Sequence, residues 1–137
     1  MMTFHWKKQF EVGRQEIDLQ HHYFVELINR IETTLSTTDD PDRRQRLMME
    51  LYKYAEFHFL SEENIALSLN LPNVVQHHEL HKELLEQIEH HIADVMAGLM
   101  SADAMINFLM EWFAGHTIHE DKRLFSQSSM THAHPPT

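Results

Sequence analysis

The segment IDLQHHYFVELINRIETTL, residues 17–35, decides the fold of this chain. Its apolar side chains recur in steps of three and four residues, which is the spacing of one face of an α-helix. The stripe consists of Ile17, His21, Phe24, Ile28, Ile31 and Leu35. One member of this stripe is a histidine, so we expect His21 to point into the interior of the protein together with its apolar neighbours.

Three further segments repeat the pattern and also place histidines or acids on the apolar stripe. The second stripe consists of Leu47, Leu51, Tyr54, His58, Glu62, Ile65 and Leu69. The third consists of Val74, His77, His81, Leu84, Ile88, Ile92 and Val95, and the fourth of Met105, Leu109, Trp112 and His116. An unpaired polar group in an apolar core costs about 2–7 kcal/mol. The polar groups on these stripes therefore need partners or a metal.

Composition narrows the class of protein. A chain of 137 residues with 42% hydrophobic content is typical of one domain with a real core. A formal net charge of −10 argues against a nucleic-acid partner, because phosphates would be repelled. The first residues, MMTFHWKKQF, lack the apolar run of a signal peptide, and no stretch is long enough to span a membrane, so we expect a cytoplasmic protein with no membrane partner. Cysteine is absent, so any metal must use nitrogen and oxygen ligands.

Helix-start and helix-stop signals predict four helices with short connections. Residues 37–41, TTDDP, supply a capping residue followed by proline at the first helical position, and residues 70–73, NLPN, are expected to start the third helix in the same way. We expect Gly98 to end the third helix and Ser101 to cap the fourth. Short connections favour antiparallel neighbours, so the predicted fold is all-α, an up-down-up-down antiparallel four-helix bundle.

The two ends of the chain lie outside this helical pattern. The segment from Met1 to about Glu16 has aromatic residues without a helical period, and we expect an extended amino-terminal arm that packs across the bundle. We assign residues 1–125 to the bundle domain. Residues 126–137 have too little apolar content to pack, so we expect a flexible tail or the start of a linker.

The spacing of the polar residues indicates a shared site. His58 with Glu62, and His77 with His81, are four residues apart and therefore share one helix face. Imidazole suits iron, copper, nickel and zinc, whereas carboxylates suit harder ions, so a mixed set favours a borderline metal. Seven candidate ligands are too many for one such ion. They are His21, His58, Glu62, His77, His81, His116 and Asp121. Two metals with bridging carboxylates are the natural arrangement.

One pair does not fit an ideal helix. His116 and Asp121 are five residues apart, which places them about 140° apart around a regular α-helix. Asp121 therefore needs a local π-type widening or a helix end close by. Two other metal-site classes lack their motifs: no glutamate is followed three places later by histidine, and His78-Glu79 does not continue as His-Glu-x-x-His.

The chain resembles a bacterial hemerythrin domain from Trp6 to about Leu124. The motifs that carry the resemblance are Val12-Gly13, Ile17-Asp18-Leu19-Gln20-His21, His58-Phe59 followed by Glu62-Glu63, His77 through His81, and Trp112 leading to His116 and Asp121. The resemblance implies a non-heme centre of two iron ions joined by an oxo or hydroxo bridge. It also implies O₂ binding, with cycling between diferrous and diferric states.

The resemblance also implies a role for each site residue. His77, His81 and His116 would hold one iron, His21 and His58 the other, and Glu62 and Asp121 would bridge them. The iron with two histidines would carry the open position to which O₂ binds. The walls of the oxygen pocket would be Phe24, Phe59, Trp112 and Thr117.

Four positions depart from the usual pattern of such domains. Ala66 stands where a larger apolar residue is usual, Asn70-Leu71 replaces a common Gly-Tyr, and Thr117 follows His116 where an aliphatic residue is usual. We expect a wider or more polar pocket that solvent or anions reach readily. The oxygenated form would then decay quickly to the diferric state.

Three classes of function remain open from the sequence. The favoured hypothesis is an oxygen or redox sensor that controls an attached carboxyl-terminal signalling module, such as a diguanylate cyclase or a chemotaxis receptor. The second is a free-standing oxygen carrier or store. The third is an enzyme that turns over peroxide or nitric oxide, and it ranks last because no dedicated acid or base is visible. The expected partners are O₂, small anions or NO, and the signalling module.

Overall fold

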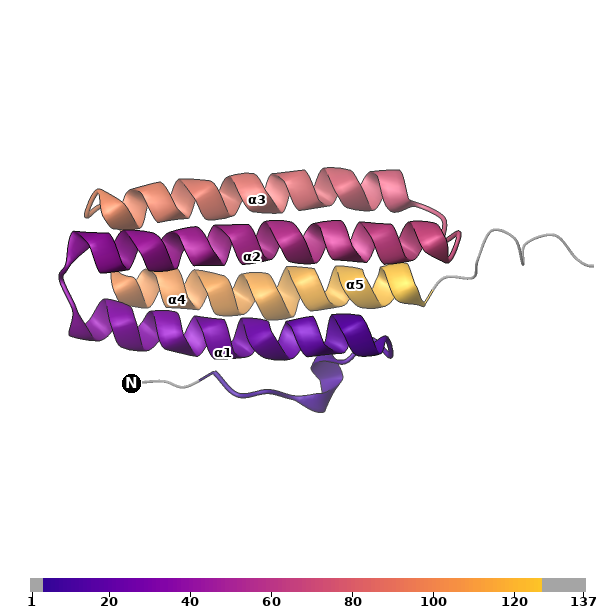
Figure 1. The fold of residues 1–137 in the computed structure, drawn as a ribbon, viewed down its shortest axis with the longest axis horizontal. Coiled ribbons are helices and arrows are strands. Elements are labelled where there is room, and N and C mark those ends of the chain that lie inside the picture. Colours follow the sequence, from indigo (N-terminus) through magenta and orange to yellow (C-terminus); the bar gives the residue numbers. More distant parts are fainter. Residues whose placement is uncertain (1–3, 127–137) are drawn as a thin grey trace, which may run out of the picture.

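The chain forms a bundle of long helices that run side by side along one axis (Figure 1). The computed structural model describes residues 4–126, and the described part contains helices and turns without strands. The long elements are α1 (Gln15–Thr37), α2 (Pro41–Ser68), α3 (Val74–Met96), α4 (Ala102–Glu111) and α5 (Ile118–Phe125). A π-helical segment, Trp112–Thr117, joins α4 to α5, so the fourth rod of the bundle is α4, the π-helical segment and α5 in succession.

Contacts between the elements close the bundle. Helix α1 packs against α2 and α4, α2 packs against α3, and α3 packs against α4 and α5. Short turns link α1 to α2, α2 to α3 and α3 to α4 and reverse the chain direction each time, as Figure 1 shows. The predicted all-α, up-down-up-down four-helix bundle is confirmed. In the described range no helix is both long and apolar enough to cross a membrane.

Two helix starts are as predicted. The side chain of Asp40 accepts a hydrogen bond from the backbone N–H of Asp42 at 3.1 Å, and Pro41 occupies the first helical position of α2. The side chain of Ser101 accepts from the N–H of Ala104 at 3.1 Å and caps α4. Each cap pairs one of the N–H groups that a helix start leaves without an intrahelical partner.

The predicted start of α3 is wrong. Helix α3 begins at Val74, so Pro72 lies in the preceding turn and not at the first helical position. Asn73 precedes the helix with a left-handed φ of 67° and makes no side-chain cap. Asn70, two residues before the proline, has a left-handed φ of 55°, which ends α2. Pro72 therefore belongs to the turn between the two helices.

Asn70 terminates α2 in a way that explains its place in the sequence. The N–H of Asn70 donates to the carbonyl of Leu67 at 3.1 Å, and the N–H of Leu71 donates to the carbonyl of Ala66 at 3.0 Å. This pair of bonds is a Schellman motif, which needs a left-handed residue that is usually glycine and sometimes asparagine. Asn70 is therefore a workable substitute for the glycine that is common at this point.

The amino-terminal arm is described from residue 4 onward and lies along α1 (Figure 1). Asn29 holds its start, because the N–H of Phe4 donates to Oδ1 of Asn29 at 2.6 Å and Nδ2 of Asn29 donates to the carbonyl of Phe4 at 2.7 Å. Most of the arm is extended as expected. A short 3₁₀ turn, Lys8–Phe10, interrupts it and buries the ring of Phe10. The predicted tail, residues 126–137, lies outside the described residues except for Ser126.

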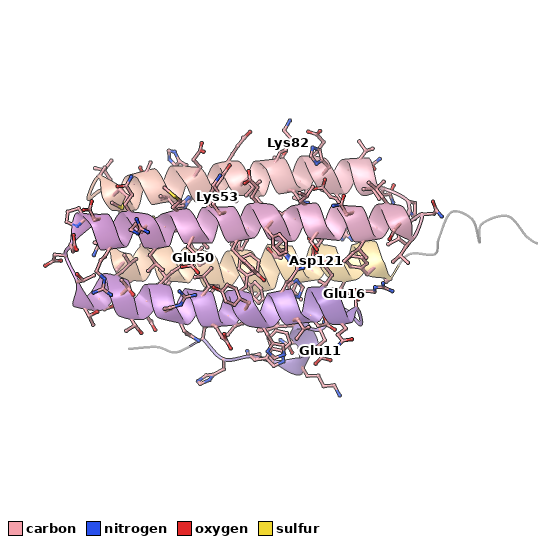
Figure 2. All side chains as sticks on the ribbon, in the orientation of Figure 1. Glu11, Glu16, Glu50, Lys53, Lys82 and Asp121 are labelled. Atoms are coloured by element: carbon pink, nitrogen blue, oxygen red, sulfur yellow. The ribbon has the colours of Figure 1, made fainter. Side chains whose placement is uncertain are left out.

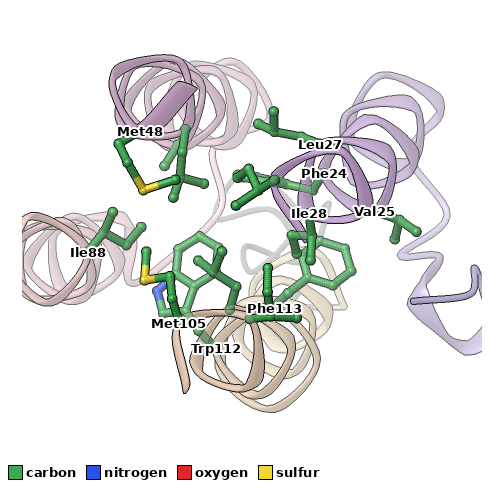
Figure 3. Close-up of a cluster of buried hydrophobic side chains, with 14 of the residues drawn as sticks. Phe24, Val25, Leu27, Ile28, Met48, Ile88, Met105, Trp112 and Phe113 are labelled. Atoms are coloured by element: carbon green, nitrogen blue, oxygen red, sulfur yellow. The ribbon is translucent and has the colours of Figure 1, made fainter. Parts of the chain in front are cut away.

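Two apolar clusters lie on either side of the polar residues along the bundle axis. The larger cluster takes side chains from all four rods of the bundle, and Figure 3 shows Phe24, Met48, Ile88, Met105 and Trp112 pointing toward a common centre. The smaller cluster is built around Ala66, Leu71 and Leu124, near the α2–α3 turn. The buried histidines and acids of the four stripes therefore have apolar packing on both sides.

The end of α3 yields a prediction about stability. Gly98 has a φ of 77°, and Leu99 donates to the carbonyl of Asp94 at 2.8 Å in a second Schellman motif. Gly98→Ala should lower the free energy of unfolding by about 1 kcal/mol, because a Cβ is strained in this backbone conformation. Chemical denaturation measures the change. Ala97→Ser, at the neighbouring residue with an ordinary φ of −86°, is the control; equal losses in both variants would contradict the assignment.

Candidate metal centre

Six of the seven predicted ligands meet at one level of the bundle. They come from every rod of the bundle, and none is more than 7% exposed. The six are His21 on α1, His58 and Glu62 on α2, His77 and His81 on α3, and Asp121 on α5. Figure 2 shows Asp121 between the ribbons of the bundle. The backbone of His116 belongs to the π-helical segment, and its side chain lies outside the described part of the structure.

The carboxylate of Asp121 lies between two groups of histidines. Its Oδ2 atom is 2.8 Å from Nε2 of His21 and 3.5 Å from Nε2 of His58. Its Oδ1 atom is 3.4 Å from Nε2 of His77. The two oxygens thus face different histidines, which is the geometry of a carboxylate that can bridge two ions.

The carboxylate of Glu62 also lies between the two groups of histidines, but through a single oxygen. Its Oε1 atom is 3.1 Å from Nε2 of His81, 3.6 Å from Nε2 of His58 and 3.9 Å from Nε2 of His77. In each of two sets, one candidate ligand atom per residue lies within 4.8 Å of all the others. The sets are His21, His58, Glu62 and Asp121, and Glu62, His77, His81 and Asp121. Both carboxylates belong to both sets.

The π-helical segment explains how Asp121 reaches this site. A π-helix bonds residue i to residue i+5, so residues five apart can share a face there, which they do not on a regular α-helix. The segment Trp112–Thr117 supplies the widening that the spacing between His116 and Asp121 requires. Helix α5 then resumes with Asp121 directed into the bundle and buried.

Several atoms at the site are buried without a hydrogen bond in the described part of the chain. These are Nε2 of His58, His77 and His81, and both carboxylate oxygens of Glu62. Each buried polar atom left unpaired costs about 1–3 kcal/mol. Together they present imidazole nitrogens and carboxylate oxygens toward one space, a donor set that suits iron and other borderline metals. The residues present therefore fit a metal pair.

Burial keeps two of the imidazoles, those of His58 and His81, neutral. It lowers the pKa of the His58 imidazole, and it lowers the pKa of His81 to about 4. A neutral ring has one nitrogen lone pair available, whereas a protonated ring has none. At neutral pH these two histidines are in the form that binds metal.

The two carboxylates have opposite pKa shifts. Burial and the neighbouring charge of Asp121 raise the pKa of Glu62 well above its usual range. Burial also acts to raise the pKa of Asp121, but the polar groups of Glu62, His21 and His58 that face its carboxylate hold it well below the usual range. Without a cation the pair therefore keeps a proton. A bound cation would allow both carboxylates to ionise.

Three histidines, His21, His58 and His81, each make a hydrogen bond through Nδ1, which fixes the orientation of the ring. The bonds are from Nδ1 of His21 to the carbonyl of Phe10 at 3.1 Å, from Nδ1 of His58 to Oε1 of Gln20 at 2.7 Å, and from Nδ1 of His81 to Oε2 of Glu63 at 2.7 Å. All three partners are acceptors, so the proton lies on Nδ1. In His58 and His81 this leaves the lone pair on Nε2, whereas Nε2 of His21 is 2.8 Å from Oδ2 of Asp121. This arrangement orients histidines in metal sites and makes them stronger ligands.

Sequence reasoning assigned no role to these three partners. Gln20 and Glu63 were quoted within motifs, and their position next to His21 and Glu62 was the only signal. The carbonyl of Phe10 could not be found from sequence, because it depends on the path of the arm. Phe113 was also missed; its ring meets the His21 ring edge-on, with centroids 5.5 Å apart.

Two of the four predicted pocket residues, Phe24 and Phe59, pack against ligand residues. The ring of Phe24 meets His58 edge-on at 5.1 Å, and Phe59 stacks on His81 at 4.0 Å. Trp112 contacts both phenylalanines. Two buried polar atoms of the π-helical segment, Nε1 of Trp112 and Oγ1 of Thr117, have no hydrogen-bond partner among the described residues.

Two features bear on access to the site. Ala66 packs with Leu71 and Leu124 in the smaller apolar cluster. A surface groove of about 340 Å³ lies beside His77, between α3 and α5, and Arg123 forms part of its wall. His77 is the most exposed of the six ligands described, at 7%.

Comparisons with known proteins agree with this geometry. The family described as the hemerythrin HHE cation binding domain matches residues 12–128. A "Bacteriohemerythrin" of Clostridium acetobutylicum is 27% identical over 124 residues, covering 87% of this chain and 96% of that protein. A "Hemerythrin-like protein" of Naegleria gruberi is 25% identical, covering 88% and 89%. A "Bacteriohemerythrin" of Pseudomonas aeruginosa is 23% identical, covering 85% and 75%.

The raised pKa of Glu62 predicts an unusual effect on stability. After metal is removed with a chelator, Glu62→Gln should be more stable than the unchanged chain at neutral pH, by more than about 1 kcal/mol, because ionising Glu62 costs about 1.4 kcal/mol per unit of raised pKa. Once the pH is below the raised pKa, the advantage should shrink as the pH falls toward the ordinary pKa of a glutamate, because there the unfolded chain takes up a proton as well.

Urea unfolding at neutral and mildly acidic pH measures this difference. Glu86→Gln, at an exposed position of α3, is the matched control and should change little. A loss of stability in metal-free Glu62→Gln at neutral pH would contradict the electrostatic account.

Proposed function

The chain belongs to the hemerythrin family of cation-binding domains, and on that premise we propose that it binds two iron ions and O₂ and acts as an oxygen or redox sensor. The proposed ligands are His77, His81 and His116 for one iron and His21 and His58 for the other, with Glu62 and Asp121 bridging. When bound, the two irons supply reversible electron transfer between the ferrous and ferric states.

One observation carries the proposal of a metal pair. Two buried carboxylates are each shared between two groups of histidines, and the Nε2 atoms of His58, His77 and His81 are without a hydrogen bond in the described chain. A single ion needs only one such group. Two groups with common carboxylates support two ions held close together.

The residues around the ligands support binding of a small, uncharged molecule. Phe24, Phe59 and Trp112 are buried and exclude water from the side of the site that faces the larger cluster. Gln20 and Glu63 hold imidazole rings in place. Because the walls that Phe24, Phe59 and Trp112 supply are large aromatic rings, we propose binding rather than catalytic turnover.

The sensor role rests on the connections of the site to both ends of the described chain. His21 is bonded to the carbonyl of Phe10 in the arm and to Asp121 on α5. A change of charge at bound irons would alter the interactions of both partners. Helix α5 ends four residues after Asp121, at Phe125. A shift in either element would bias a module attached to it.

A second candidate is a free-standing oxygen carrier or store. It is supported by the relative from Clostridium acetobutylicum, 96% of which is covered by the match. That protein therefore consists almost wholly of this kind of domain. The carrier role needs slow oxidation in air, whereas the sensor role needs a fast response.

Metal content tests the ligand assignment. The unchanged protein should contain two irons per chain, and Glu62→Ala and Asp121→Ala should each contain one or fewer, because each removes a carboxylate that both ions share. Glu86→Ala, on the exposed face of α3, should keep both irons. Iron quantification, with circular dichroism to establish that each variant is folded, gives the answer. Unchanged iron in both site variants would refute the bridging roles.

The rate of oxidation separates sensor from carrier. Reduced protein exposed to air should return to its oxidised spectrum within minutes, because the buried hydroxyl of Thr117 makes the pocket more polar. Thr117→Val keeps the shape and removes the hydroxyl, so it should slow the return about fivefold, equivalent to about 1 kcal/mol.

Thr37→Val, at the exposed end of α1, is the control for this substitution. A return that takes many hours in the unchanged protein would favour the carrier over the sensor. An unaltered rate in Thr117→Val would remove the hydroxyl from the explanation.

A further inference from the structure

A cationic groove lies on the α1–α2 hairpin, away from the metal centre. Its volume is about 660 Å³, and its walls carry four cationic side chains, Arg30, Arg43, Arg46 and Lys53, against the single acid Glu50. The whole chain has 11 Lys and Arg against 21 Asp and Glu. The groove therefore has a net positive charge, although the protein as a whole is strongly acidic.

The acid in the groove is already neutralised by its neighbours. Glu50 accepts hydrogen bonds from Tyr23 at 2.8 Å and from Arg30 at 3.1 and 3.2 Å. The hydrogen bond from Tyr23, followed by that from Arg30, lowers the pKa of Glu50, so it stays ionised and paired. Glu50 thus fixes Arg30 in place and does not pair with the other cations of the groove.

The remaining cations are free to bind a ligand. Arg43 and Arg46 are exposed and form no ion pair within residues 4–126. Lys53 is 3.8 Å from Glu56, and both side chains are largely exposed, so that contact is weak. Two guanidinium groups one helical turn apart, with an ammonium group further along, face the same groove.

The spacing of these charges selects an extended anion. From Arg43 to Lys53 the helix rises about 15 Å, and Arg30 faces them from α1. A single small anion cannot contact charges spread over that length. Guanidinium groups bind phosphate through paired N–H donors, so a chain of phosphates matches the arrangement.

We propose that this groove binds a small polyanion that carries several phosphate groups. Its volume lies in the range of small-molecule sites, about 300–1,000 Å³. A stable protein–protein interface takes about 20–30 residues on each side, whereas eight residues line this groove. Leu47 and Met49 add an apolar wall against which a nucleoside can rest, so inorganic polyphosphate and a nucleoside triphosphate share the required chemistry.

The groove is separate from the metal centre. Arg46 precedes His58 by twelve residues on α2, a rise of about 18 Å. Figure 2 shows Glu50 and Lys53 nearer to the α1–α2 turn than Asp121. Binding here can therefore be tested without reference to O₂ chemistry, and a failure of one proposal does not affect the other.

Isothermal titration of the metal-loaded protein with sodium tripolyphosphate, and separately with ATP, tests the proposal. Both should bind, more weakly as salt rises, and Arg43→Gln with Arg46→Gln should weaken binding about ten- to hundredfold. The control is the double variant Lys7→Gln with Lys82→Gln, which removes two positive charges at exposed positions outside the groove. It should change the affinity less than about twofold. Metal content measured after each titration identifies any heat caused by chelation.

The outcomes distinguish the possible occupants. Equal affinity for tripolyphosphate and ATP would assign binding to the phosphates, and tighter binding of ATP would assign a nucleotide. A poly-glutamate peptide that binds more tightly than either would overturn the proposal in favour of an acidic protein segment. Absence of binding, or equal affinity in the arginine variant and its control, would also overturn it.

Discussion

Two carboxylates buried side by side, Glu62 and Asp121, are the constraint on which the rest of the structure depends. Two negative charges in a low-dielectric interior repel each other, and burial keeps neighbouring imidazoles such as His58 and His81 neutral, so these rings do not compensate that charge. The metal-free pair therefore retains a proton on Glu62. The site becomes electrostatically complete when cations occupy it, which is why we regard metal binding as the purpose of this arrangement.

The surrounding structure holds this costly group in place. Apolar clusters pack on either side of it, and Nδ1 hydrogen bonds to the carbonyl of Phe10, to Gln20 and to Glu63 orient the imidazoles. The π-helical segment, Trp112–Thr117, turns Asp121 inward at the expense of regular helix hydrogen bonding. The irregular helix and the buried polar side chains therefore occur at the same place in the bundle. Such departures from a regular, apolar core are typical of functional sites.

The bundle and most of the site could be predicted from sequence, because the helical period determines which residues share a face. That period alone placed His58 with Glu62, and the irregular spacing before Asp121 required either a π-type widening or a helix end close by, of which the structure has the widening. The start of α3 was missed, since Pro72 suits both a first helical position and a turn, and the left-handed Asn70 decides between them. The partner of His58, Gln20, comes from another helix, and contacts of that kind leave no periodic signal.

The absorption spectrum of metal-quantified protein tests the central claim most directly. It should be recorded as isolated, after anaerobic reduction, and during re-exposure to air. We predict two irons per chain, with near-ultraviolet and visible bands that bleach on reduction and return in air. A featureless spectrum with zinc bound, or one metal ion per chain, would contradict a pair of redox-active irons bridged by Glu62 and Asp121.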